Sequence, residues 1–131
     1  MNEFDAILLD AIDEGLYSLG DSIRQTIYFH LERSFHIKKE EIPERIGAFT
    51  QAIENIFGFG ANPIKIMIMK KLSEKVGAVF KWSEFERFGF VEYVARARLF
   101  FGEKERIKTV EELVGWEEAE VEIRRPRVRA D

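Results

Sequence analysis

A glycine-containing loop holds the residues of this chain that are best suited to bind a small ligand. The loop runs from Gly58 to Pro63 and leads into an expected helix, with Lys65 in the first turn. Free N–H groups and the helix dipole attract anions at such a position. The candidate anion-binding residues are Gly58, Gly60, Asn62 and Lys65. A phosphate loop, however, needs Gly-Lys-Ser or Gly-Lys-Thr after a strand. A plain turn between two helices is therefore the favoured interpretation of residues 58–62.

The other residue types form no recognisable catalytic or metal-binding constellation. The sequence has no cysteine, which excludes thiolate ligands, cysteine nucleophiles and disulfides. His30 and His36 are six residues apart, a spacing that does not align two imidazoles on one helical face. Carboxylate clusters such as Asp10, Asp13 and Glu14 are explained by solvated helix faces and capping. We predict no catalytic residue, no metal site and no cofactor, and favour a non-catalytic protein over the alternative of a small anionic-ligand binder or enzyme that uses residues 58–62.

Basic residues become frequent toward the C-terminus, within residues 96–108 and 124–129. Basic side chains among aromatic ones can bind single-stranded nucleic acid through phosphate contacts and stacking. Acidic neighbours such as Glu103, Glu105 and Glu117 dilute this field, and the net charge of the chain is −4. Nucleic-acid binding through the basic C-terminal region is therefore the weaker alternative, and an ion-paired surface is favoured.

Phenylalanine is unusually abundant, with 12 residues in the chain. Phe88, Phe90, Phe100 and Phe101 fall in one expected helix, which is more than a single apolar stripe can bury. Large exposed apolar patches mark protein contacts, and two-fold dimers are the commonest closed assembly. We therefore predict an interface that includes Phe90, Phe100 and Phe101, formed with a second copy or with another protein.

The elements that position these residues are predicted to be helices, because apolar residues recur at helical spacing along most of the chain. Glycine, proline and capping residues give approximate bounds, which are 4–15, 21–35, 43–57, 62–76 and 83–102, with a short sixth helix over 109–114. The fourth helix is apolar on most sides, so we expect it and the fifth to be central.

The pattern changes after Trp116, where residues 120–125 alternate between polar and apolar. This alternation is compatible with a small β element paired with residues 79–82, or with a frayed tail over 117–131. We predict an all-α bundle of five to six helices in one domain, residues 1–131, with this small β element or tail at the C-terminus.

The class of protein is bounded by size and hydropathy. A chain of 131 residues has the size of one domain. No apolar run approaches the roughly 20 residues that a membrane span needs, and the acidic start is not a secretory signal. We therefore expect a cytoplasmic protein without membrane contact. Many Glu, Lys and Arg residues with few Asn and Gln residues favour a thermophilic source.

Several segments resemble an archaeal family, the Nitrosopumilus output domain. The resembling segments are Leu9–Leu16, Leu19–Ser22, Tyr28–Glu32, Ile37–Pro43 and Lys70–Lys75, and the resemblance covers about residues 5–95. It implies an archaeal helical module associated by name with signalling output, and it brings no catalytic residues to this chain. Together with the surplus of aromatic residues, it favours a non-catalytic helical interaction or signalling-output module.

Overall fold

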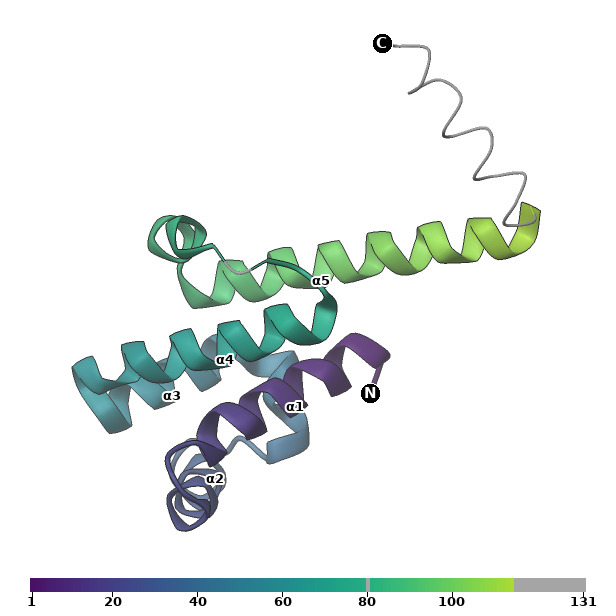
Figure 1. Cartoon of the computed structure of the whole chain (residues 1–131). Coiled ribbons are helices and arrows are strands. Elements are labelled where there is room, and N and C mark those ends of the chain that lie inside the picture. The colour runs from purple at the N-terminus through teal and green to yellow at the C-terminus, as the bar shows by residue number, and fades with distance from the viewer. Residues whose placement is uncertain (80, 115–131) are drawn as a thin grey trace. The chain divides into compact units, whose positions relative to one another are not determined.

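The computed structural model describes residues 1–79 and 81–114, and these residues form helices joined by short turns (Figure 1). The α-helices are α1 (Glu3–Tyr17), α2 (Asp21–Phe35), α3 (Ile46–Phe57), α4 (Ala61–Val76) and α5 (Trp82–Val114), and 3-10 helices η1 (Lys39–Arg45) and η2 (Gly58–Gly60) precede α3 and α4. These residues include no strand, which confirms the all-α prediction for the described part of the chain. The alternating segment 120–125 and the predicted tail lie outside the described residues, and Trp82, expected to end its partner strand, begins α5 instead.

The chain divides into two compact units, residues 1–98 and 99–131. The first unit contains α1 to α4 and the beginning of α5, and the second contains the C-terminal part of α5. The prediction of one domain over residues 1–131 stays a prediction. Within the described residues, no helix has both the length and the hydropathy that a membrane crossing requires.

Helix α4 contributes a largely buried face to the first unit. Its inward residues are almost fully buried, including Ile64, Ile68, Met69, Leu72 and Val76. Helix α1 lies beside α4 (Figure 1), and Gly15 of α1 lies against Ile68 of α4. A Cβ atom at Gly15 would lie 2.6 Å from Cγ1 of Ile68. Gly15 is therefore a packing residue, and the prediction that α1 ends there is wrong, because the helix continues to Tyr17.

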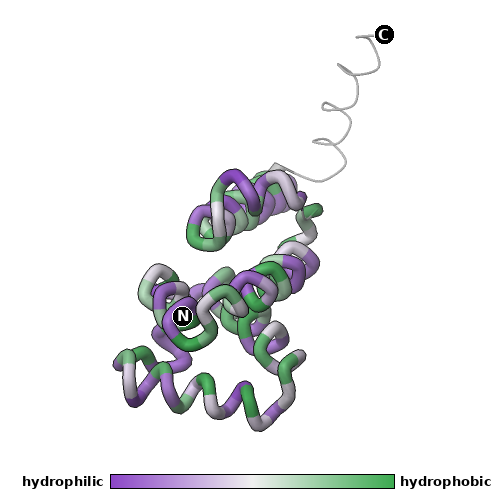
Figure 2. Tube along the Cα trace, turned by 90° about the vertical axis from the view of Figure 1, so that its left-hand side faces the viewer, coloured by the Kyte–Doolittle hydropathy of each residue, from purple (hydrophilic) through white to green (hydrophobic). Residues whose placement is uncertain are grey.

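Helices α2 and α3 also contribute to the core of the first unit. Figure 1 shows α2 nearly end-on while α1, α3 and α4 are seen from the side, so α2 runs across them. In Figure 2 hydrophobic and hydrophilic residues alternate along these helices, as amphipathic packing requires. Ile27 and Leu31 of α2 and Phe49 and Ile53 of α3 are buried. The end of α2 at Phe35 agrees with the prediction, and His36 closes it in a left-handed conformation (φ 57°, ψ 39°).

Helix α5 differs from the prediction in three respects. Gly89 interrupts it with φ 77° and ψ −178°, a conformation essentially restricted to glycine. Beyond this kink the helix does not stop at Gly102, and the separate sixth helix from Thr109 is absent, because one continuous helix runs to Val114. A glycine inside a helix costs only about 1 kcal/mol, and the residues after Gly102 are good helix formers. Thr109 does not act as a cap, since its hydroxyl donates to the carbonyl of Glu105.

The beginning of α5 is fixed to the first unit by buried contacts. Phe90, Tyr93, Val94 and Ala97 are buried, and the hydroxyl groups of Tyr93 and Ser73 are hydrogen-bonded. Arg98 places Nη1 2.8 Å from Oδ1 of the buried Asp5. The fifth helix, expected to be central, is so only in part, because Phe90, Tyr93, Val94 and Ala97 enter the core while Leu99 and Phe100 are exposed.

Candidate interaction surfaces

The loop before α4 does not gather the four candidate anion-binding residues around one point. The Lys65 side chain is buried and its ammonium group is paired with Glu54 of α3. Gly60 takes the N-cap position without a side-chain hydrogen bond, so Asn62 lies inside α4 instead of capping it. Gly58 has φ 58° and ψ −128° and turns the chain. The cation that the anion-binding prediction requires is therefore engaged by a carboxylate that the sequence places eleven residues earlier.

The two histidines serve separate positions. His30 is exposed on α2, and His36 is the left-handed residue after α2, with its carbonyl accepting a hydrogen bond of 2.6 Å from Arg45 Nη1. Among the described residues, no group of three or more His, Cys, Asp or Glu side chains is placed to hold a metal ion.

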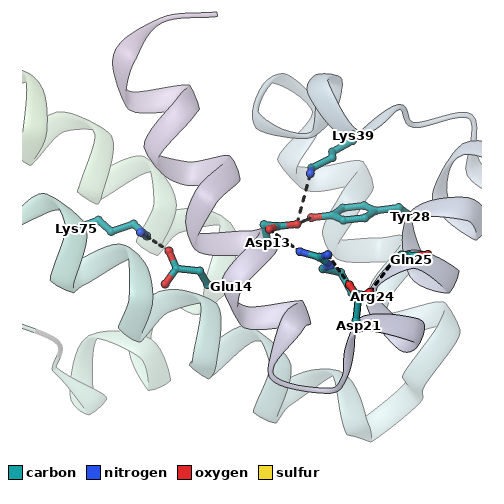
Figure 3. A network of polar contacts seen from close by, with 8 residues as sticks. All are labelled: Asp13, Glu14, Asp21, Arg24, Gln25, Tyr28, Lys39 and Lys75. Atoms are coloured by element: carbon teal, nitrogen blue, oxygen red, sulfur yellow. Dashed lines mark hydrogen bonds and ion pairs between the residues drawn. The ribbon is translucent and has the colours of Figure 1, made fainter.

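The most connected polar cluster surrounds Asp13 and joins α1, α2 and η1 (Figure 3). Tyr28 donates its hydroxyl to Asp13 Oδ1 at 2.8 Å, and Arg24 Nη1 lies 2.9 Å from Asp13 Oδ2. Lys39 Nζ approaches Asp13 Oδ1 at 3.4 Å. Arg24 also reaches Asp21 Oδ1 at 2.5 Å. We call Asp13, Arg24, Tyr28 and Lys39 the Asp13 cluster.

The electrostatics of the Asp13 cluster follow from one carboxylate held by three donors. Burial raises the pKa of the Asp13 carboxyl, but the Tyr28 hydrogen bond and the charges of Lys39 and Arg24 outweigh it and hold that pKa below its usual 3.8. Burial raises the pKa of the Tyr28 hydroxyl, and its bond to the Asp13 carboxylate raises it further. Asp13 is therefore ionised and Tyr28 is neutral at ordinary pH, and neither is poised for acid–base catalysis.

Because its polar groups bind one another, the Asp13 cluster links three elements, α1, α2 and η1. Asp13 was expected on a solvated helix face, so this cluster was not predicted from the sequence. A partial signal was present, since Arg24 and Tyr28 are four residues apart and share one face of α2. Their common partner on α1 follows from tertiary packing, which that spacing does not encode.

A groove of about 350 Å³ lies between α2 and α3. Its lining is mainly apolar and consists of Ser22, Ile23, Thr26, Ile27, His30, Ile56 and Phe57. Ile23 and Ile56 are 47% and 37% exposed. The groove can accept an apolar side chain, and its polar groups are the hydroxyls of Ser22 and Thr26 and the imidazole of His30.

The second unit carries the most exposed run of large apolar side chains on a described helix. Their exposed fractions on α5 are 73% for Leu99, 41% for Phe100, 50% for Ile107, 51% for Val110 and 80% for Leu113. At 100° per residue these five positions fall in one sector of the helix. We call them the α5 stripe. The Glu103–Arg106 ion pair lies within the same sector.

The three phenylalanines predicted to form an interface have different surroundings. Phe100 belongs to the α5 stripe, and Phe101 is half-buried on a different side of the helix. Phe90 is 4% exposed and belongs to the core of the first unit, so it has no surface to offer to a partner. Ile107, Val110 and Leu113 were missed as interface candidates because a helix end was expected at Gly102.

Comparisons with protein-family models, with curated proteins and with solved structures found no match for this chain. The resemblance of residues 5–95 to the Nitrosopumilus output domain therefore stays a prediction from the sequence. The function has to be inferred from the described surfaces themselves.

Proposed function

We propose that this chain is a non-catalytic helical interaction module, of a kind suited to signalling output, that binds protein through the α5 stripe. The observation that carries the proposal is the exposure of Leu99, Phe100, Ile107, Val110 and Leu113, which ranges from 41% to 80% on one helical sector. Apolar patches of this kind on a soluble protein mark contact sites for other proteins.

The energetics of α5 support a partner. An isolated helix of about 15 residues is marginal in water, and most helices are stabilised by packing an apolar face. In α5 the buried side chains of Phe90, Tyr93, Val94 and Ala97 belong to the core of the first unit, but the α5 stripe continues past them without a cover in the described residues. Burying a large apolar side chain contributes about 1.5–3 kcal/mol when it starts fully exposed. Covering several half-exposed side chains at once therefore favours association.

The polar groups of the described residues support a binding role better than a catalytic one. The polar groups of the Asp13 cluster bind one another, and Lys65 is paired with Glu54. The small-anion alternative at residues 58–62 loses its cation through that pair. The nucleic-acid alternative depends mainly on residues 124–129, while in the described part of α5 Arg96 and Arg106 face Glu92 and Glu103.

Site-specific photo-crosslinking tests the proposal. A benzoylphenylalanine is placed at Ile107 in the α5 stripe, and the matched control carries it at Thr109, which is exposed outside the stripe and about 160° around the helix from Ile107. We expect irradiation in living cells to give discrete crosslinked protein species from position 107 and none of them from position 109. Equal crosslinking from both positions, or none from position 107, would overturn the proposal.

A paired set of variants guards against an artefact of the bulky probe. Ile107→Gln with Val110→Gln removes apolar surface from the α5 stripe, while Lys108→Gln with Thr109→Gln makes polar changes outside it. Both pairs keep good helix formers in α5, so both variants should keep the helical circular dichroism of the parent chain. Only the first pair should abolish the complexes that position 107 captures.

A further inference from the structure

We propose that the partner covering the α5 stripe is a second copy of the same chain, with the two α5 helices packed antiparallel about a two-fold axis. This inference rests on the proposed function, because it names the partner of the same surface. The heptad positions carry it. Phe100 and Ile107 occupy a positions, Glu103 and Val110 occupy d positions, and Leu99, Arg106 and Leu113 occupy the neighbouring g positions.

Glu103 selects the direction of the second helix. In a parallel pair, d positions face each other, so the two Glu103 carboxylates would be opposed at the centre of the interface. Like charges brought together at a contact are destabilising. In an antiparallel pair an a position faces a d position, and the register that places Ile107 against Val110 of the second copy keeps the two Glu103 side chains apart. Each Glu103 also keeps its own Arg106 as a partner.

The flanking charges match the same antiparallel register. Positions e of the two helices face each other along one edge of an antiparallel pair, and α5 has Lys104 and Glu111 at e positions. With Ile107 against Val110, Lys104 of each copy lies across from Glu111 of the other, so two opposite-charge pairs form by symmetry. Lys104 Nζ already lies 5.6 Å from the ring centroid of Phe100, beside the α5 stripe.

Along the other edge of the helix pair, an apolar side chain faces the long side chain of an arginine. Leu113 at a g position faces Arg106 of the second copy in this register. The aliphatic part of an arginine side chain can cover apolar surface while its guanidinium stays in water. Leu113, 80% exposed in the single chain, is thereby covered without a buried unpaired charge.

Light scattering on the purified full chain, combined with a charge exchange, tests the inference. We expect a mass of twice 15.3 kDa at high micromolar concentration that falls toward 15.3 kDa on dilution. Lys104→Glu and Glu111→Lys should each weaken association about tenfold, because each creates two like-charge contacts by symmetry. The double variant restores opposite charges across the antiparallel edge and should recover most of the parent affinity.

The outcomes separate this inference from the proposed function. Failure of the double variant to recover, with both single variants weakened, would overturn the antiparallel register, because a parallel pair would set Arg106 against the new Lys at position 111. A mass of 15.3 kDa at all concentrations, with position 107 crosslinked to a different protein in cells, would overturn the second copy and leave the interaction module standing. A dimer unaffected by Ile107→Gln with Val110→Gln would also overturn it, since that dimer would use another surface.

Discussion

The hydrogen bond from Tyr28 to Asp13 offers a quantitative test of the Asp13 cluster as a stabilising link between α1, α2 and η1. The substitution Tyr28→Phe removes the hydroxyl and keeps the ring against which Lys39 Nζ lies, 4.9 Å from the ring centroid. Tyr17→Phe is the matched control, because Arg24 lies over the Tyr17 ring at 5.0 Å and the Tyr17 side chain is largely exposed. Both variants lose one hydroxyl, but only Tyr28 donates it to a carboxylate.

The expected magnitude follows from the charge and exposure of the acceptor. A hydrogen bond to a charged group contributes about 1.5–3 kcal/mol. The Asp13 side chain is 27% exposed and keeps Arg24 and Lys39 as partners, so water and these cations replace part of the loss. We therefore expect Tyr28→Phe to lower the free energy of unfolding by about 1.5 kcal/mol, and Tyr17→Phe to change it by less than about 0.5 kcal/mol.

Urea unfolding followed by circular dichroism at several pH values measures both effects. The native pKa of Asp13 lies below 3.8, so its contribution to stability is complete well above pH 3.8 and is lost as the pH falls through the native pKa. The difference between the parent chain and Tyr28→Phe should therefore be full at pH 7 and should shrink below pH 3.8. A loss of unfolding free energy that is equal for both variants, or that is independent of pH down to pH 2, would refute the stabilising role of the Asp13 cluster.

Four glycine substitutions test the packing of the helices, three of them by thermal unfolding and Gly102→Ala by helix content and association. Gly15→Ala should lower the free energy of unfolding by about 1–3 kcal/mol, because the added Cβ overpacks against Ile68. Gly47→Ala is the control: its Cβ meets nothing within 4 Å, so the change should be neutral or stabilising by up to about 1 kcal/mol. Equal effects of the two substitutions would contradict the close approach of α1 and α4. Gly89→Ala should cost about 1–3 kcal/mol because of its φ of 77°, and an unchanged unfolding temperature would argue against the kink. Gly102→Ala should raise the helix content and tighten the association of the chain, because a Cβ there meets nothing within 4 Å and alanine favours the helix by about 1 kcal/mol. Weaker association would count against the α5 stripe as the contact surface.

Features of the fold that depend on local sequence were predictable. The helical spacing of Leu8 and Ile12 was read correctly, since both are buried on α1, and the end of the fourth helix before Gly77 was also expected. The end of α2 was also correct, although His36 takes the left-handed position more commonly occupied by glycine. Helical periodicity and the chemistry of helix ends act over a few residues, so a single sequence contains them.

The remaining features depend on contacts between distant residues or on small differences in energy. The partners of Asp13 and Lys65 lie eleven or more residues away along the chain, and helical spacing does not specify them. Gly102 carries the same local signal as a helix end, and its small cost is outweighed by the helix formers on either side. Phe90 and Phe100 look alike in the helical pattern, and only packing on the first unit distinguishes the buried ring from the exposed one.

Deuterium uptake by the backbone amides of residues 100–113, measured on the parent chain at two protein concentrations, tests the central claim most directly. If the α5 stripe is a surface between copies, these amides should exchange slowly at high micromolar concentration and at least tenfold faster after dilution below the dissociation constant. The amides of residues 90–97, which belong to the core of the first unit, should be protected equally at both concentrations. Slow exchange over residues 100–113 that does not change with concentration, in a chain that light scattering shows to be monomeric, would mean that the chain covers its own stripe and would contradict the account.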